Sequence, residues 1–240
     1  MAFVAGLTLL AVWAGAATFA DAPPTPRLDH AWAHAIARVH TPVLDTAAGL
    51  LSVVGGFPGG IVVGALLAVV ILRRRGVLPA SIFVVAALLS EADVLLLKVV
   101  SHRVDPGGTV FAGLGSFPSG HVANAAVIAV TAAVLVPRGA GWLPGAGYVL
   151  LMALDRTYLR AHWLTDTLAG AAAGGAVAAL AWSLLLVIGT PDRVEVRHDR
   201  AEAMDPADRR SRDESPERLS RAPGPVEARS ADPVRPRRAA

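Results

Sequence analysis

The sequence predicts an all-α polytopic membrane protein, with six transmembrane helices in a bundle and a disordered C-terminal tail. Of its 240 residues, 54% are hydrophobic and 17% are charged, and this is less charge than a soluble domain usually carries. The charge is also uneven. Residues 1–190 hold 10 Lys and Arg and 8 Asp and Glu, whereas residues 191–240 hold 12 Arg and 11 Asp and Glu. We therefore expect a membrane domain over 1–190 and a disordered polar tail over 191–240.

Six apolar segments approach the length of about 20 residues that a helix needs to span a bilayer. They are 3–20, about 47–72, 79–98, 121–137, 142–158 and 163–189. The second segment contains Gly-Gly-Phe-Pro-Gly-Gly at 55–60, so we expect a loop or a kink there. The first segment lacks the basic stretch that begins a signal peptide, so we interpret it as an uncleaved helix.

Arginines predict the orientation of these segments. Arg73, Arg74 and Arg75 follow the second segment, Arg138 follows the fourth, and the arginine-containing tail follows the sixth. With six spans, all three connections lie on one side, and positive loops favour the cytoplasm. This predicts a multi-pass protein of the plasma membrane with a cytoplasmic tail and outer loops at 21–46, 99–120 and 156–162.

The first outer loop contains Leu-Asp-His-Ala-Trp-Ala-His-Ala-Ile-Ala-Arg-Val-His at 28–40, a pattern that predicts a short amphipathic helix in the outer interface. The expected apolar face consists of Leu28, Trp32, Ala35, Ile36 and Val39. The expected polar face consists of His30, His34 and Arg38. His30 and His34 have a spacing that can hold a metal ion, but no carboxylate cluster accompanies them, so a solvated polar face is the favoured interpretation.

Composition excludes several classes of protein. The chain has no cysteine, which excludes disulfides and thiolate metal sites. The net charge is +3, and no basic run alternates with aromatic residues, so we do not expect nucleic acid as a partner. No cluster of Asp and Glu indicates a magnesium site, and we expect no metal or other cofactor.

Three polar clusters fall on the outer side of the predicted topology. The first is Lys98, the only lysine of the chain, at the end of the third apolar segment. By itself it is equally well explained as an anchor at the membrane surface. The second is Pro-Ser-Gly-His at 118–121, where the fourth segment begins. A helix N-terminus has unpaired N–H groups that suit an anion, whereas a plain N-cap would explain Ser119 but not His121.

The third cluster comprises Arg156, His162 and Asp166, beside the start of the sixth segment. His162 and Asp166 are four residues apart, so they share one helical face, and the carboxylate can hold the imidazole in one tautomer. A merely structural His–Asp pair is the alternative, but an Asp in a membrane domain is costly. Together the three clusters predict a phosphate site in which one histidine attacks phosphorus and the other protonates the leaving oxygen.

These residues resemble the motifs of the type 2 phosphatidic acid phosphatase superfamily, which includes membrane lipid phosphatases and soluble vanadium haloperoxidases. That family has a lysine, six residues and then Arg-Pro; a Pro-Ser-Gly-His; and a Ser-Arg, five residues, His, three residues and Asp. The resemblance covers roughly residues 1–190 in topology and 98–166 in motif. The second motif is complete here, and the first and third are matched at Lys98, Pro106, Arg156, His162 and Asp166.

Two positions depart from the family pattern. Asp155 stands where the family has serine, and Asp105 stands where it has the arginine of the first motif. Arg103, two residues earlier, fits a family variant with an additional arginine. Three outcomes are open for Asp105: it points away while Arg103 supplies the charge, it pairs with Arg103 or Arg156, or the enzyme is weak or inactive. The first is favoured because the reacting residues are all present.

The resemblance implies a role for each matched residue. His162 is the nucleophile that forms a phosphohistidine, Asp166 orients it, and His121 is the general acid. The residues expected to hold the phosphoryl oxygens are Lys98, Arg103, Ser119, Gly120 and Arg156. Within the third segment, Glu91 is expected to pair with a polar group of the bundle, and Asp93 has no evident partner.

The resulting hypothesis is an integral membrane phosphatase that acts on a lipid phosphate or diphosphate without a metal. The leading substrates are undecaprenyl diphosphate, phosphatidic acid and phosphatidylglycerol phosphate, with a slight preference for the first, which is recycled at the outer face of bacterial membranes. The alternatives are a haloperoxidase that binds vanadate, a non-catalytic binder or scaffold with a degenerate site, and a transporter. The six spans disfavour the first of these, and the few polar residues at mid-membrane disfavour the last.

Overall fold

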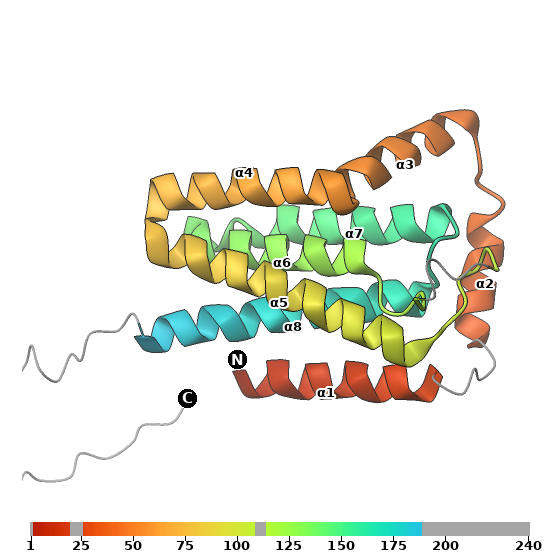
Figure 1. Cartoon of the computed structure of the whole chain (residues 1–240). Helices are drawn as coiled ribbons and strands as arrows, with labels where there is room; N and C mark the ends of the chain where they lie inside the picture. The colour runs from red at the N-terminus through yellow and green to blue at the C-terminus, as the bar shows by residue number, and fades with distance from the viewer. Residues whose placement is uncertain (1, 20–25, 109–113, 189–240) are drawn as a thin grey trace, which may run out of the picture. The chain divides into compact units, whose positions relative to one another are not determined.

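The computed structural model describes residues 2–19, 26–108 and 114–188, and every regular element within them is helical. The predicted all-α class is therefore confirmed, whereas the tail expected over 191–240 lies outside the described residues. The elements are α1 (Ala2–Phe19), α2 (Arg27–Ile36), α3 (Pro42–Gly55), α4 (Phe57–Arg75), α5 (Val77–Ser101), α6 (Gly120–Leu135), the 3₁₀-helix η1 (Pro137–Gly139), α7 (Trp142–Tyr158) and α8 (Leu164–Ile188) (Figure 1).

Three of the described helices, α1, α5 and α8, are long and apolar enough to cross a membrane. The pair α3 and α4 passes the same test only when taken together as one bent span. Helix α6 is apolar but has 16 residues, and α7 has 17 residues with Asp155 and Arg156 in its last turn. Length and composition therefore support three or four spans among the described residues, fewer than the six that the sequence predicts.

The kink expected at 55–60 is present as a 56° bend between α3 and α4. Gly56 has an extended backbone, and Pro58 lies in the first turn of α4, where its missing N–H and fixed φ favour a helix start. Gly59 sits against the preceding turn: a Cβ on it would lie 2.2 Å from the carbonyl oxygen of Val53. Gly56, Pro58 and Gly59 therefore favour a bend at the position where the sequence predicts it.

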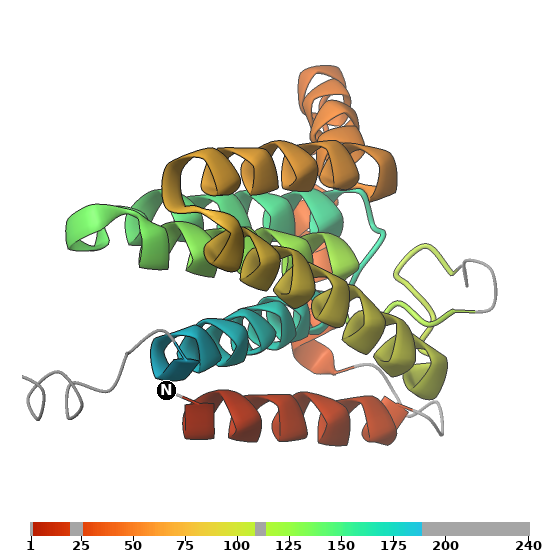
Figure 2. The ribbon, with the colours of Figure 1, turned by 60° about the vertical axis from the view of Figure 1, so that its left-hand side comes forward.

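Helix α6 forms the centre of the bundle. It packs against α5, α7 and α8, and Figures 1 and 2 show it enclosed by these helices. Most of its buried residues are Ala or Val, which allow close approach. On α8, a Cβ on Gly174 would lie 2.1 Å from the carbonyl oxygen of Ala123, and one on Gly170 would lie 2.4 Å from that of Ser119. The small residues thus let α8 touch the backbone of α6.

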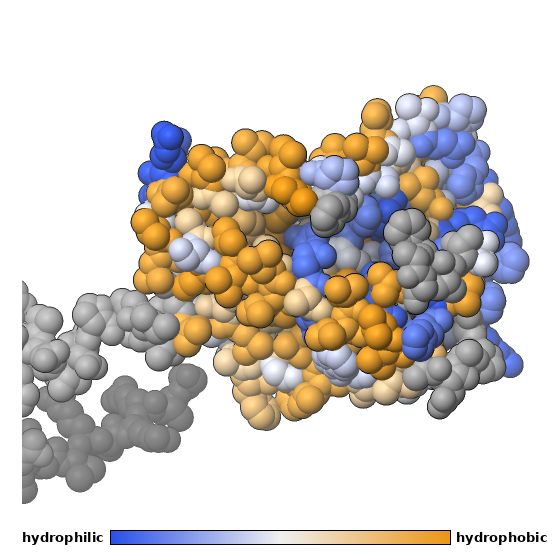
Figure 3. Space-filling view, viewed as in Figure 1, coloured by the Kyte–Doolittle hydropathy of each residue, from blue (hydrophilic) through white to orange (hydrophobic). Residues whose placement is uncertain are grey.

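Large apolar side chains cover much of the exterior, as expected for contact with lipid. On α4 they include Ile61, Val62, Leu66, Val69 and Val70, each at least half exposed. In Figure 3 apolar residues dominate the length of the helices, while hydrophilic ones gather at the end where α2 and α3 lie and around a central hollow.

Helix α2 confirms that the first outer loop contains a short helix, but its faces differ from the prediction. Asp29 is fully buried, and Trp32 and Ile36 are half-buried on the same side. Leu28 and Val39, both expected on the apolar face, are 58% and 49% exposed. The helix is turned because the Asp29 carboxylate binds Arg103 at 2.6 Å, an ion pair that the apolar pattern does not reveal.

Candidate active site

A polar cavity of about 620 Å³ lies where α5 ends and α6 begins. Five of the eight residues predicted for the site line it, namely Lys98, Gly120, His121, Arg156 and His162. Asp166 lies directly behind His162, and its carboxylate oxygen Oδ2 is 3.6 Å from Nδ1 of the imidazole. The two predicted histidines and two of the predicted cations therefore share one cavity, although they come from four parts of the chain.

His162 is held in the connection between α7 and α8. Its backbone N–H donates to the carbonyl oxygen of Arg156 at 3.3 Å, and its side chain is only 10% exposed. Asp166 is fully buried in the first turn of α8, where Oδ2 also accepts from the N–H of Trp163 at 2.9 Å. This places Nδ1 toward the carboxylate and leaves Nε2 as the nitrogen that can react.

The surroundings of His162 favour its neutral form. Burial lowers the pKa of the imidazole, and the positive charges of Lys98 and Arg156 lower it further, against the opposing effect of Asp166. A charged imidazolium has no lone pair with which to attack. The net result is an imidazole that stays neutral, and therefore nucleophilic, at a lower pH than a free histidine.

Arg156, in the last turn of α7, joins three groups at the cavity wall. Its Nε donates to Asp155 at 2.9 Å, its Nη2 donates to Oγ of Ser52 at 2.7 Å, and its Nη1 lies 3.2 Å from Nε2 of His121. A guanidinium only donates hydrogen bonds, so Nε2 of His121 accepts here and carries no proton. Asp155, which replaces the serine of the family motif, thus fixes the direction of the guanidinium.

The Pro-Ser-Gly-His cluster forms the N-terminal end of α6 beside the cavity. The N–H of Ser119 donates to the carbonyl oxygen of Asp166 at 3.0 Å, which ties the second motif to the third. Gly120 and His121 line the cavity, so the first turn of α6 faces it. Ser119 does not line it: its side chain is fully buried, and its Oγ has no hydrogen-bond partner among the described residues.

Lys98 reaches the cavity from the last turn of α5 and is partly buried. Its Nζ donates to the carbonyl oxygens of Gly115 at 2.9 Å and Ser116 at 3.4 Å. The backbone N–H of Gly115 donates in return to the carbonyl oxygen of Lys98 at 3.1 Å. The segment before α6 therefore holds the ammonium group at the rim of the cavity.

We expected Arg103 to supply the positive charge that Asp105 lacks, and the positions of the two side chains correct this expectation. Arg103 is 6% exposed and does not line the cavity, because its guanidinium binds Asp29 and Asp166. Asp105 itself lines the cavity, where its Oδ1 accepts from the N–H of Gly107 at 2.8 Å. Arg103 thus acts on Asp166 rather than on a phosphate, and Asp105 does not point away from the site.

Sequence reasoning missed four contributors to this region. Ser52 binds Arg156, Asp29 binds Arg103, and Trp13 donates from Nε1 to Asp93 at 2.9 Å. Asn124 donates to Glu91 at 2.5 Å, which confirms the polar partner expected for Glu91. A signal existed only for Asp29, a charged residue that shares one helical face with the apolar residues Trp32 at i+3 and Ile36 at i+7.

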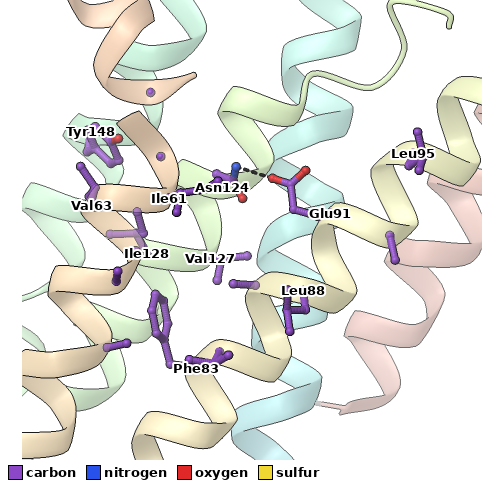
Figure 4. A pocket seen from close by; sticks show the side chains of 18 residues that line it. Ile61, Val63, Phe83, Leu88, Glu91, Leu95, Asn124, Val127, Ile128 and Tyr148 are labelled. Atoms are coloured by element: carbon purple, nitrogen blue, oxygen red, sulfur yellow. Dashed lines mark hydrogen bonds between the residues drawn. The ribbon is translucent and has the colours of Figure 1, made fainter. Parts of the chain in front are cut away.

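A second cavity, of about 730 Å³, adjoins the first between α4, α5 and α6. Its walls are mostly apolar, and Figure 4 shows side chains such as Val63, Phe83 and Ile128 pointing into it. Gly55, Glu91 and Asn124 line both cavities. The hydrogen bond between Glu91 and Asn124, dashed in Figure 4, therefore stands where the polar cavity meets the apolar one.

A helical membrane protein with two histidines and fixed cations around one cavity has the arrangement of a phosphoryl-transfer enzyme. Residues 79–188 match the family model of the PAP2 superfamily, and this match confirms the resemblance that the motifs indicate. The chain is a phosphoric ester hydrolase, and its residues 79–188 are similar to this superfamily.

Two solved structures are similar in fold. The first transmembrane PAP2 type phosphatidylglycerolphosphate phosphatase from Bacillus subtilis is 20% identical, with a TM-score of 0.64 over 78% of this chain and 98% of that one. LpxE of Aquifex aeolicus is 21% identical, with a TM-score of 0.54 over 63% of this chain and 92% of that one. No curated protein sequence matches the chain. At these identities the structural likeness supports the fold alone.

Proposed function

We propose that the chain is an integral membrane lipid phosphatase, which hydrolyses a lipid phosphate monoester or diphosphate through a phosphohistidine on His162 without a metal. The observation that carries this proposal is the junction of the two cavities: a cation-lined cavity with two histidines adjoins an apolar one, and three residues line both. Such a junction fits a ligand with a phosphate at one end and a hydrocarbon chain at the other.

In the proposed first step, Nε2 of His162 attacks phosphorus, so that an N–P bond forms and the bond between phosphorus and the leaving oxygen breaks. His121 gives its proton to that oxygen, and Asp166 stabilises the positive imidazole through Nδ1. In the second step, His121 takes a proton from water, which attacks phosphorus and releases His162. Lys98, Arg156 and the N–H groups at Gly120 stabilise the charged phosphoryl oxygens.

Arg156 is proposed to couple binding to this proton transfer. Because Nη1 of Arg156 lies 3.2 Å from Nε2 of His121, that nitrogen must be released before it can carry a proton. Phosphoryl oxygens compete for the guanidinium as charge-assisted acceptors. Substrate binding thus draws Arg156 away from His121, and the negative charge of the substrate favours a protonated His121.

The apolar cavity is proposed to hold the start of the hydrocarbon chain. Undecaprenyl diphosphate, phosphatidic acid and phosphatidylglycerol phosphate remain the leading substrates. The hydrogen-bonded pair of Glu91 and Asn124 at the junction has further polar atoms that can bind glycerol and ester oxygens. The first methylene groups of a prenyl chain would cover those atoms without replacing their hydrogen bonds to water, at a cost. This position therefore shifts the preference from the prenyl lipid to the two glycerolipids.

We further propose that α6 and α7 complete a six-span bundle with its site on the outer face of the plasma membrane. In support, Nη2 of Arg75 donates to the carbonyl oxygen of Leu135 at 2.5 Å, so the α4–α5 and α6–α7 turns meet at one end. The cavity residues lie at the opposite ends of the same helices (Figure 1). The positive-inside rule assigns the arginine end, and the tail that follows α8, to the cytoplasm.

The proposed function is tested by measuring phosphate release in detergent with EDTA present, from the three lipids offered in parallel. We expect release that is unaffected by EDTA, and a phosphorylated His162 peptide after a quench in base, in which an N–P bond survives. Loss of release with EDTA would overturn the metal-independent mechanism. No release by folded protein would favour the non-catalytic binder, for which Asp105 in the cavity is the specific observation, and Asp105→Arg would then test whether activity returns.

The buried position of His162 predicts an unusual pH dependence. Since burial lowers the pKa of this imidazole, we expect kcat/KM not to decrease as the pH falls past about 6.5, the ordinary value for histidine. It should decrease only at lower pH, where His162 becomes protonated and loses its nucleophilic lone pair. NMR titration of the His162 ring separates this effect from the titration of the substrate, and a ring pKa above 6.5 would contradict the prediction.

A further inference from the structure

Asp29 is the most completely buried carboxylate outside the motifs of the site. It lies in the first turn of α2, is 0% exposed, and does not line the cavity. Its Oδ1 accepts from the N–H of Thr165 at 2.9 Å, and its Oδ2 accepts from Oγ1 of Thr165 and from Nη2 of Arg103, both at 2.6 Å. These three hydrogen bonds are all made beside the first turn of α8.

Arg103 connects Asp29 to the reacting groups. Its Nη1 donates both to Oγ1 of Thr165 at 2.7 Å and to Oδ1 of Asp166. The ring of Phe19 covers the guanidinium at 4.2 Å, and that of Trp163 lies at 5.6 Å. A continuous series of contacts thus runs from Asp29 through Arg103 and Asp166 to His162, shielded from water.

The two carboxylates in this series, Asp29 and Asp166, compete for the single guanidinium of Arg103. One guanidinium is shared between two buried carboxylates, so neither carboxylate is fully neutralised. If Asp29 lost its charge, Arg103 would pair with Asp166 alone and bind it more strongly. The oxygen Oδ2 of Asp166 would then stabilise a positive His162 less well. A buried ion pair is also sensitive to the loss of one member, because the remaining charge is left without compensation.

On the basis of the proposed function, we propose that Asp29 is a positioning residue of the reaction. By sharing Arg103, it holds Asp166 in place and preserves the negative charge that Asp166 presents to His162. Helix α2, which lies outside residues 79–188 of the family match, is in this view a part of the active site. The other charged or titratable groups near His162 are Lys98, Arg156 and His121, and Asp105 and Glu91 line the same cavity.

The test is Asp29→Asn, which keeps the shape of the side chain and removes its charge. We expect kcat to fall by roughly 10- to 100-fold, since small displacements of a catalytic group cost this much. KM should be unchanged, because Asp29 does not line the cavity. The acidic limb of the pH profile should move to lower pH by about half a unit or more, since Arg103 then opposes a positive His162 more strongly.

The matched control is Asp45→Asn on α3, which removes a carboxylate that binds Tyr158 and His40 and lies outside the cavity. It should leave kcat and the acidic limb unchanged. Asp29→Glu keeps the charge, so the acidic limb of the pH profile of this variant should lie at the same pH as in the wild type, even where its activity is lower. A purely structural role would lower activity equally at every pH.

An unchanged kcat and an unchanged limb in Asp29→Asn, with an active wild type, would overturn the inference and leave the proposed function intact. An inactive wild type would instead overturn the proposed function. Should Asp29→Asn not fold, Thr165→Val serves as the second variant, because Oγ1 of Thr165 joins Arg103 to Asp29. We expect a lower kcat at unchanged KM for this variant, and an unchanged kcat would overturn the inference.

Discussion

Replacing His162 with alanine is expected to lower phosphate release by at least ~10³-fold, because the attacking nitrogen is removed. The cavity would keep Lys98, Arg156 and the helix N-terminus, so binding of the lipid should change far less than kcat. Phosphate release from the preferred lipid, with EDTA present, measures the loss. The phosphorylated peptide found in the wild type should be absent from the variant.

The matched control for this loss is His34→Ala, which removes an exposed histidine of α2 that lies outside the cavity. It should keep release close to that of the wild type. If His162→Ala retained more than about a tenth of the wild-type rate, His162 would not be the nucleophile. Attack by water, activated by His121, would then become the preferred mechanism.

Gly174→Ala is expected to have the largest effect on stability. A Cβ at this position would lie 2.1 Å from the carbonyl oxygen of Ala123 and 2.7 Å from its carbonyl carbon, and a backbone cannot move aside as a flexible side chain does. Overpacking of this kind costs about 1–3 kcal/mol. We expect the midpoint of thermal unfolding in detergent to fall by roughly 5 °C or more, together with the activity, because α6 carries His121.

The neighbouring residue supplies the control, since a Cβ on Gly175 would have nothing within 4 Å. Gly175→Ala should leave the unfolding midpoint unchanged or raise it slightly, because alanine is favoured over glycine in a helix by up to about 1 kcal/mol. Equal effects of the two substitutions would show that loss of glycine itself matters, and that the contact between α8 and α6 does not limit the packing.

The helices and the cavity-lining residues of the motifs could be predicted from the sequence because their signals are local. Apolar length gave the boundaries of α5 and α7 within a few residues, and Gly and Pro located the bend between α3 and α4. The spacing of the motifs identified Lys98, His121 and His162, because this spacing is a property of the chain and does not depend on packing.

The sequence could not assign Arg103 because its partners lie far along the chain. Asp29 is 74 residues away and Asp166 is 63 residues away, and only the packing of α2 against α8 brings them to one guanidinium. Arg103, which lies near the first motif, was therefore predicted to bind phosphate, whereas its guanidinium is held by two carboxylates. The pairing of Glu91 was expected, but Asn124 as its partner depended on how α5 meets α6.

The bend between α3 and α4 has a consequence for how this protein can change over time. It leaves Gly55 and Gly56 beside the reacting residues, and a Cβ on Gly56 would lie 3.2 Å from Nε2 of His121 while one on Gly55 would lie 2.3 Å from Cε of Met152. A larger residue at Gly56 would crowd His121, and one at Gly55 would crowd Met152 of α7. Mutational drift toward a new lipid is thus restricted at this wall of the cavity, where a change of residue would also disturb His121.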